Sequence, residues 1–286
     1  LRTIHGVKIP ETSVELFGHK LAFPVLAAPI TGMETNLAEG MDEREYADAI
    51  LDGCLECGTL GMVGDGASPK KYLIGLEAIK KRGGLGIPIF KPREYNLDII
   101  KRFKAAEDAG AIAVGIDIDA ASFKTMSLKG QAVGPKTIAE LQELKSHLKV
   151  PFILKGIMNV ESALAAIEAG ADAIVVSNHG GRVMDHMPGT AEVLPEIANA
   201  VGGRVKILVD GGIREGVDIL KMLALGADAV MIGRPICIAA FGAGQEGVSF
   251  YLREKLNELK KAMILTGCAS IGRIDPSVIF RCKGER

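Results

Sequence analysis

The sequence lacks an excess of charge of either sign. It holds 34 Lys and Arg against 35 Asp and Glu, a formal net charge of -1 over 286 residues. Such a chain has no global basic field for nucleic acid or an anionic membrane, so any anion must be bound locally. It also lacks an apolar run near the ~18 residues of a membrane span, and a charged-then-apolar signal segment at its start. These absences predict a cytoplasmic protein with no membrane span and no nucleic-acid partner.

Cysteine is scarce and odd in number. Five cysteines do not suggest a disulfide framework, and they favour a reduced, cytosolic compartment. Cys54 and Cys57 form a C-x-x-C pair, but no second pair or nearby histidine completes a set of metal ligands. We therefore expect no metal site and a structural role for this pair, with a redox-active pair as the alternative. The first residue is Leu1 rather than Met, which leaves open whether a native N-terminal segment precedes it.

Two kinds of short apolar segment alternate along the chain, which indicates an internal repeat. One kind follows a glycine, at Gly58, Gly110, Gly170 and Gly226. The other kind often begins near a proline, after Pro24, Pro88 and Pro151, with a fourth example from Val205. All are rich in Val, Ile, Leu and Ala without polar alternation, which is typical of strands buried on both faces of a parallel sheet.

Amphipathic stretches of helical length separate these segments. They cover residues 45–57, 97–110, 135–147, 160–170, 191–201 and 216–226. Eight strands and eight crossovers give about 36 residues per unit, a normal size for a right-handed βαβ step. We therefore predict an α/β fold with one domain over residues 1–286, a single TIM (β/α)8 barrel, with residues 242–286 as a C-terminal outer helix and tail packed on it. An open, doubly wound sheet is the alternative, which the regular alternation disfavours.

Polar residues follow the apolar segments where the active site of such a barrel forms, at the carboxyl ends of the strands. They are Asp117, Lys155, the SNHGGR of residues 177–182, the DGGIR of residues 210–214 and the GRP of residues 233–235. His179 can act as a base, Asp117 can orient and charge its imidazole, and Arg182 offers a planar fork to a carboxylate. Together they match the parts sought in an active site.

Glycines after the last two strands form a candidate anion cradle. Gly211, Gly212 and Gly233 let backbone N–H groups and a helix N-terminus approach a phosphate, with Arg234 beside them. Lys155 at a buried strand end needs an anionic or electron-rich partner, because an unpaired ammonium is costly there. Tight turns and a surface lysine are the structural alternatives.

The stretch from Pro151 to Cys268, with its SNHGGR, DGGIR and GRP motifs, resembles the FMN-dependent 2-hydroxy-acid oxidase and dehydrogenase family, which includes glycolate and lactate oxidases. These motifs at this spacing are highly specific, whereas the likeness is thin before Ile112. The resemblance implies FMN as cofactor, a small 2-hydroxy acid as the substrate that is oxidised to a 2-oxo acid, and a homo-oligomer, commonly a tetramer.

The resemblance also implies roles for single residues. His179 matches the active-site base, Arg182 the arginine that binds the substrate carboxylate, and Asp117 the aspartate paired with that histidine. Lys155 matches the lysine at the flavin N1/O2 edge. The other positions that match cofactor-binding segments are Ala28, Pro29, Ile30, Thr31, Ser177, Asp210, Gly211, Gly212, Arg214, Gly233 and Arg234.

The substrate half departs from the family pattern. One family tyrosine belongs to an N-terminal segment outside this sequence, and another follows the third strand, where IPIFKP leaves Phe90 or Lys91. A serine-rich stretch after the second strand is replaced by MVGDGAS, and the threonine and proline around the aspartate after the fourth strand are replaced by Gly115 and Ile118-Asp119. The hydroxy acid, its chirality and the electron acceptor leave no readable pattern.

Two other functions stay open. The type 2 isopentenyl-diphosphate isomerase is a similar flavin barrel that uses reduced FMN without net redox change, and the missing tyrosines leave room for a substrate other than a small hydroxy acid. A flavin-binding barrel without hydroxy-acid activity is the non-catalytic alternative. His179 and Arg182 favour the oxidoreductase.

Overall fold

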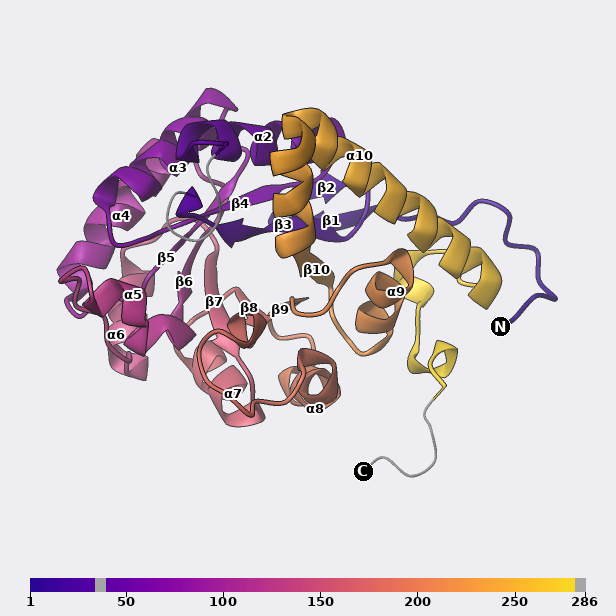
Figure 1. Cartoon of the computed structure of the whole chain (residues 1–286). Coiled ribbons are helices and arrows are strands. Elements are labelled where there is room, and N and C mark those ends of the chain that lie inside the picture. The colour runs from indigo at the N-terminus through magenta and orange to yellow at the C-terminus, as the bar shows by residue number, and fades with distance from the viewer. Residues whose placement is uncertain (34–39, 281–286) are drawn as a thin grey trace.

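The structure, a computed structural model, describes residues 1–33 and 40–280. Eight parallel strands form a closed barrel in the order β10-β3-β4-β5-β6-β7-β8-β9 (Figure 1). The strands are β3 (Val25–Ile30), β4 (Gly61–Gly64), β5 (Ile87–Phe90), β6 (Val114–Asp117), β7 (Phe152–Ile157), β8 (Ala173–Val176), β9 (Lys206–Val209) and β10 (Ala229–Ile232). Every predicted apolar segment overlaps one of them, so the predicted barrel is confirmed and the open sheet is wrong.

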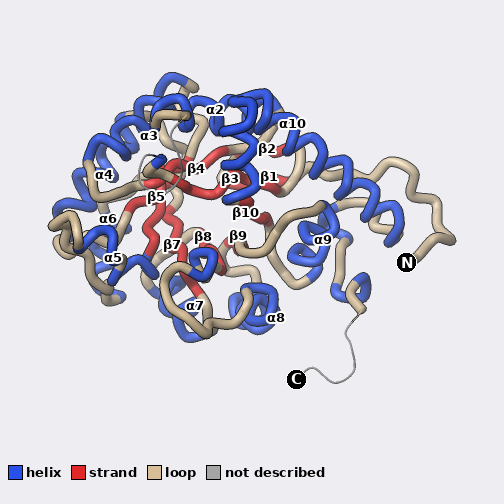
Figure 2. The backbone as a smooth tube through the Cα atoms, in the orientation of Figure 1, coloured by secondary structure: helices blue, strands red, loops and turns tan. Residues whose placement is uncertain are grey.

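Helices surround the barrel as an outer layer (Figure 2). They are α2 (Glu43–Glu56), α3 (Pro69–Lys81), α4 (Asn96–Asp108), α5 (Lys124–Ser127), α6 (Ile138–Ser146), α7 (Val160–Glu168), α8 (Thr190–Val201), α9 (Gly216–Ala224) and α10 (Arg234–Thr266). Short 3₁₀ turns are η1 (Ile118–Ser122), η2 (His179–Gly181), η3 (Ile271–Arg273) and η4 (Pro276–Val278). Each predicted helical stretch overlaps a helix, whereas α3 and the one-turn α5 were not predicted.

The outer C-terminal helix begins earlier than expected. α10 starts at Arg234 rather than near residue 242, but Ala243 and Gly244 have non-helical backbone angles and divide it in two. The second part packs closely on α2, because a Cβ added at Gly53 would lie 2.6 Å from Val248. Residues 281–286 of the predicted tail lie outside the described residues. None of the described helices, α10 included, combines the length and apolar character needed to cross a membrane.

The strand side chains alternate between two apolar clusters. Leu26 and Met231 belong to a cluster inside the barrel, whereas Val25 packs outward against the helices. A hairpin that was not predicted, β1 (Val14–Leu16) with β2 (His19–Leu21), adds Leu16 and Leu21 to the inner cluster. That cluster includes the first residues of several strands, so the hairpin closes the amino end of the barrel. The carboxyl end remains for a site.

Candidate active site

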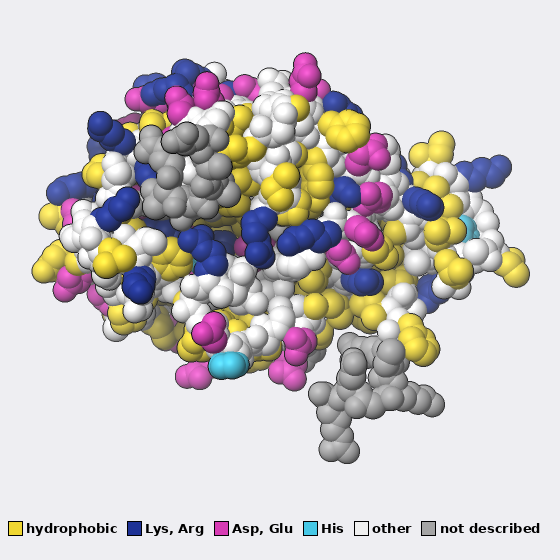
Figure 3. Space-filling view, viewed as in Figure 1, with side chains coloured by type: hydrophobic (Ala, Val, Ile, Leu, Met, Phe, Trp, Pro, Cys, Tyr) yellow, Lys and Arg dark blue, Asp and Glu magenta, His cyan; other side chains and the backbone are white. Residues whose placement is uncertain are grey.

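A cavity of about 460 Å³ opens at the carboxyl ends of the barrel strands, within the usual range for small-molecule sites. Most of the predicted site residues line it: Ala28, Pro29, Ile30, Thr31, Lys155, His179, Arg182, Asp210, Gly211, Gly212, Arg214, Gly233 and Arg234. Two predicted residues, Asp117 and Ser177, do not line it and are buried behind its wall. In Figure 3, Lys and Arg side chains form a row across the middle of one face.

The loops after β9 and β10 hold the glycines of the predicted anion cradle. Gly211 and Gly212 have φ of 96° and 76°, the left-handed region that favours glycine. A Cβ added at Gly212 would meet nothing within 4 Å, so open space adjoins this backbone. Gly233 precedes the first turn of α10 at Arg234. Free N–H groups at such a turn and helix start suit a phosphate.

Lys155 of β7 is the centre of a buried ionic cluster. Its Nζ lies 2.8 Å from Ser177 Oγ, 3.3 Å from Asp210 Oδ2 and 3.5 Å from Asp117 Oδ1. Burial alone would lower the pKa of Lys155, but the charges of Asp210 and Asp117 outweigh it and raise that pKa. The ammonium therefore stays charged beside the cavity. Asp210 Oδ1 is buried without a hydrogen-bond partner in the described part of the chain, and it suits a ligand hydroxyl.

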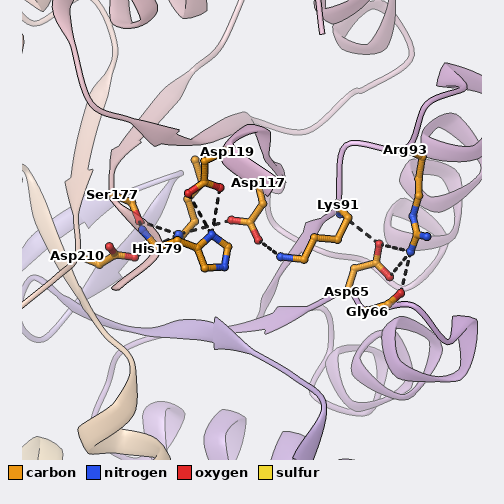
Figure 4. Close-up of polar contacts among 10 residues, drawn as sticks. Asp65, Gly66, Lys91, Arg93, Asp117, Asp119, Ser177, His179 and Asp210 are labelled. Atoms are coloured by element: carbon orange, nitrogen blue, oxygen red, sulfur yellow. Dashed lines mark hydrogen bonds and ion pairs between the residues drawn. The ribbon is translucent and has the colours of Figure 1, made fainter. Parts of the chain in front are cut away.

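Asp117 at the end of β6 serves two ammonium groups. Lys91, which follows β5, places Nζ 2.6 Å from Asp117 Oδ2, and Lys155 approaches the other carboxylate oxygen. Burial by itself raises the pKa of Asp117, but the charges of the two ammonium groups outweigh this effect. The pKa of Asp117 therefore lies well below its usual range. The carboxylate is thus ionised. Figure 4 shows these charges in one row from Asp210 to Arg93.

Ser177 supports the site from behind. It is fully buried, and its hydroxyl accepts a hydrogen bond from Lys155 Nζ and another, of 3.1 Å, from the backbone N–H of His179. His179 has a φ of 56°, a left-handed conformation that is uncommon outside glycine. We therefore interpret Ser177 as the residue that holds this backbone and the lysine, rather than as a direct cofactor contact.

The predicted pairing of His179 with Asp117 is not formed. His179 Nδ1 instead lies 3.0 and 3.1 Å from the two carboxylate oxygens of Asp119 (Figure 4). Asp117 instead pairs with Lys155 on β7, its direct partner in the β6–β7 register, and with Lys91, which follows β5. Asp119, the second residue of η1, is the residue that sequence reasoning missed. Its signal was the second aspartate of the GIDID motif.

Gly156 explains how Asp119 reaches over β7 to the loop after β8. The β7–β8 register shifts between Lys155 and Ile157, and Gly156 has a φ of 102°. A Cβ added at Gly156 would lie 2.5 Å from Cβ and Cγ of Asp119. Any other residue at this position would displace the aspartate, so the missing side chain creates the path between carboxylate and imidazole.

Asp117, Asp119 and His179 also satisfy the geometry of a metal-binding group, since one ligand atom from each lies within 4.8 Å of the others. Asp117 already contacts two ammonium groups. These cations balance its charge, so the described contacts account for the group without a metal ion.

The C-x-x-C pair lies away from the cavity. Cys54 is buried in the core on α2, where burial raises its thiol pKa to about 12. Cys57 donates to the backbone oxygen of Ser249 on α10 at 3.3 Å. A buried neutral thiol is a poor nucleophile, so the structure supports the structural role.

Comparison with known proteins defines the class of this chain. The model of the family described as FMN-dependent dehydrogenase matches residues 1–138 and 122–281. An L-lactate oxidase of Lactobacillus jensenii is 34% identical over 94% of this chain and 72% of its own length. A 4-hydroxymandelate oxidase of Amycolatopsis orientalis is 34% identical over 91% of this chain and 80% of its own length.

Solved structures agree with this result. A crystal structure of mandelate oxidase has a TM-score of 0.80 and 30% sequence identity, covering 96% of this chain and 84% of that one. A mandelate oxidase variant with a monooxide FMN adduct has a TM-score of 0.78 and 32% identity, covering 96% of this chain and 85% of that one. The chain belongs to the FMN-dependent dehydrogenase family, and it is an FMN-dependent enzyme of the 2-hydroxy-acid oxidase class.

Proposed function

We propose that this enzyme oxidises a 2-hydroxy acid to the 2-oxo acid with His179 as the base and Arg182 as the carboxylate-binding residue. The observation that carries the proposal is the His179–Asp119 pair, at 3.0 Å, on the wall of the cavity that Lys155 and the glycine cradle also line. Base, carboxylate clamp and cofactor-binding groups thus share one space.

The cofactor-facing residues fit FMN. Gly211, Gly212, Gly233 and Arg234 would hold its phosphate, and the free Oδ1 of Asp210 would accept a hydroxyl group. Lys155 would place a fixed positive charge beside the ring. When bound, FMN would supply the acceptor for the two electrons and for the second of the two hydrogens that the substrate loses, the first being the proton taken by His179.

His179 takes the proton that the substrate loses. Its Nδ1 faces Asp119, so Nε2 is the ring nitrogen left for the substrate. The Asp119 carboxylate fixes the ring orientation and stabilises the imidazolium once the proton has arrived. Positioned acid–base catalysis of this kind contributes about 10²–10⁴-fold to the rate. Arg182 has no acidic partner among residues 1–33 and 40–280, and its planar fork suits the substrate carboxylate.

Anaerobic reduction of the bound flavin tests the proposal. The purified holoenzyme is mixed without oxygen with a panel of 2-hydroxy acids, and the flavin absorbance and the 2-oxo acid formed are measured. We expect at least one acid to bleach the flavin with one equivalent of 2-oxo acid. A flavin that no acid bleaches, together with turnover of isopentenyl diphosphate after external reduction, would identify the isomerase instead. No reaction in either assay would favour a barrel without hydroxy-acid activity.

We propose in addition a cytoplasmic homo-oligomer. The four described cysteines are free, which suits a reducing compartment. On α10, Phe250 is 65% exposed and lies outside the cavity lining, and a subunit contact would bury such an apolar side chain. Light scattering on the purified protein measures the mass, and a tetramer is expected by family analogy. A monomer at micromolar concentration would contradict the oligomer.

A further inference from the structure

Lys91 carries a buried charge that the proposed reaction has not yet used. It follows β5, its side chain is 10% exposed, and it lines the cavity. An ammonium group has three N–H donors. One donates to Asp117 Oδ2 at 2.6 Å, and no other acceptor contacts this nitrogen within the described ranges. The remaining donors are therefore able to serve an acceptor inside the cavity.

The Lys91 backbone is fixed by a second ionic cluster. Its N–H donates to Asp65 Oδ2 at 3.1 Å, and Asp65 also pairs with Arg93 at 2.9 Å. Both of these side chains are almost fully buried. Lys91 is thus held at its backbone by one carboxylate and at its ammonium by another. A group held at both ends binds a ligand with little loss of conformational entropy.

Phe123 brings Lys91 close to the predicted substrate clamp. Lys91 Nζ and Arg182 Cζ each lie 5.1 Å from the centroid of the Phe123 ring, so their separation is at most twice that distance. The His179 ring also lies 5.1 Å from that centroid. Aromatic faces attract cations at such distances. Lys91, Arg182 and His179, which come from two different loops, therefore all lie near the Phe123 ring.

We propose that Lys91 and Arg182 form a two-cation clamp on the substrate carboxylate, with Phe123 as the ring that both cations contact. The inference rests on the proposed oxidation of a 2-hydroxy acid and names a further substrate-binding residue for it. A carboxylate has two oxygens, so one can accept from the guanidinium and the other from the ammonium. The alternative is that Lys91 only neutralises Asp117.

A ligand that lacks the carboxylate separates these roles. Pyruvate and phenylglyoxylate, and the primary amide of each, are titrated into the oxidised holoenzyme, and dissociation constants are read from the flavin spectrum. In Lys91→Met we expect binding of an acid to weaken roughly 10- to 100-fold, as for loss of a charge-assisted hydrogen bond. Binding of its amide should change less than about 3-fold, within the context dependence of such contacts. Lys91→Arg should restore most of the acid affinity.

Two controls make the result decisive. Lys101→Met removes an exposed lysine on α4 and should leave both affinities unchanged, while flavin content and urea unfolding show that each variant is folded. Equal weakening of acid and amide, unchanged acid binding in Lys91→Met, or a wild type that does not prefer acid over amide would each overturn the clamp. Wild-type flavin that no 2-hydroxy acid reduces would instead defeat the proposed function, which is measured separately.

Discussion

One half of the cavity is formed mainly by backbone groups, and the other half mainly by charged side chains. The proposed cofactor half, after β9 and β10, consists mainly of backbone at Gly211, Gly212 and Gly233, with a helix start at Arg234. The proposed substrate half, after β4 to β6 and β8, consists mainly of charged side chains that pair across elements, as in Lys91 with Asp117 and His179 with Asp119. A backbone cradle is specified by a few adjacent residues, whereas a charge network depends on which side chains meet in space.

The largest expected effect concerns the charge network. Asp117→Asn leaves two buried ammonium groups without their shared carboxylate, and breaking a buried ion pair from one side costs about 3–5 kcal/mol. Since the folded pKa of Asp117 is lowered, its stabilisation is fully present above the ordinary Asp value of about 3.9, and it declines as the pH falls from there through the lowered folded pKa. In urea unfolding, the free energy of unfolding of the variant should lie far below that of the wild type at pH 7 and closer to it at pH 3. A deficit that is equal at both pH values would contradict this account.

A smaller effect is expected for Asp119, which contacts His179, than for Asp117, which pairs with the two lysines. Asp119→Asn keeps the shape but removes the charge that faces His179 Nδ1, so we expect flavin reduction to slow roughly 10- to 100-fold, part of the contribution of positioned acid–base catalysis. FMN content and pyruvate affinity should not change. Stopped-flow reduction measures the rate. Wild-type speed in Asp119→Asn would show that Asp119 does not position the base.

The cofactor half should respond in binding rather than in rate. Arg234→Ala removes one charged group from the cradle while the glycine backbone remains, so we expect FMN affinity of the apoprotein to fall roughly 10-fold, the lower end for a charge-assisted hydrogen bond. Quenching of FMN fluorescence measures it. Arg253→Ala is the matched control, because it removes an arginine further along α10 that pairs with Glu56 of α2 rather than with the cradle. Equal losses in both variants would mean that the cradle does not bind the phosphate.

The smallest effect is expected outside both halves. Cys57→Ser replaces a thiol that contacts only the backbone of Ser249 among the described hydrogen bonds, so flavin reduction and reoxidation should change less than about 2-fold, as is usual for a substitution away from special features. Stopped-flow absorbance measures both. A large loss of reoxidation would revive the redox interpretation of the C-x-x-C pair.

The same division explains what the sequence could predict. All eight barrel strands were predictable, since each coincides with a mostly apolar run that lies near a Gly or Pro. The hairpin of β1 and β2 was not, because two strands of three residues carry too little pattern. The cradle glycines were predictable from adjacent residues. The pairing of His179 with Asp119 rather than with Asp117 was not predictable, since it depends on the space over Gly156 on β7.

Ser177 is a second case in which the sequence predicts the position of a residue but not the contacts of its side chain. The motif placed it correctly at the end of β8, but its side chain points to Lys155 and to the His179 backbone rather than into the cavity. A motif gives the position of a residue along a strand, whereas the direction of its side chain depends on the local backbone.

One stopped-flow comparison tests the central claim, that an imidazole on the cavity wall takes the substrate proton. His179→Asn is the suitable variant, since asparagine tolerates the left-handed backbone at this position better than most residues. Wild type and variant, both loaded with FMN, are mixed anaerobically with the hydroxy acid that reduces the wild type fastest. The account predicts that the variant keeps its yellow flavin but is reduced about 10²–10⁴-fold more slowly. Reduction of both proteins at the same rate would contradict it.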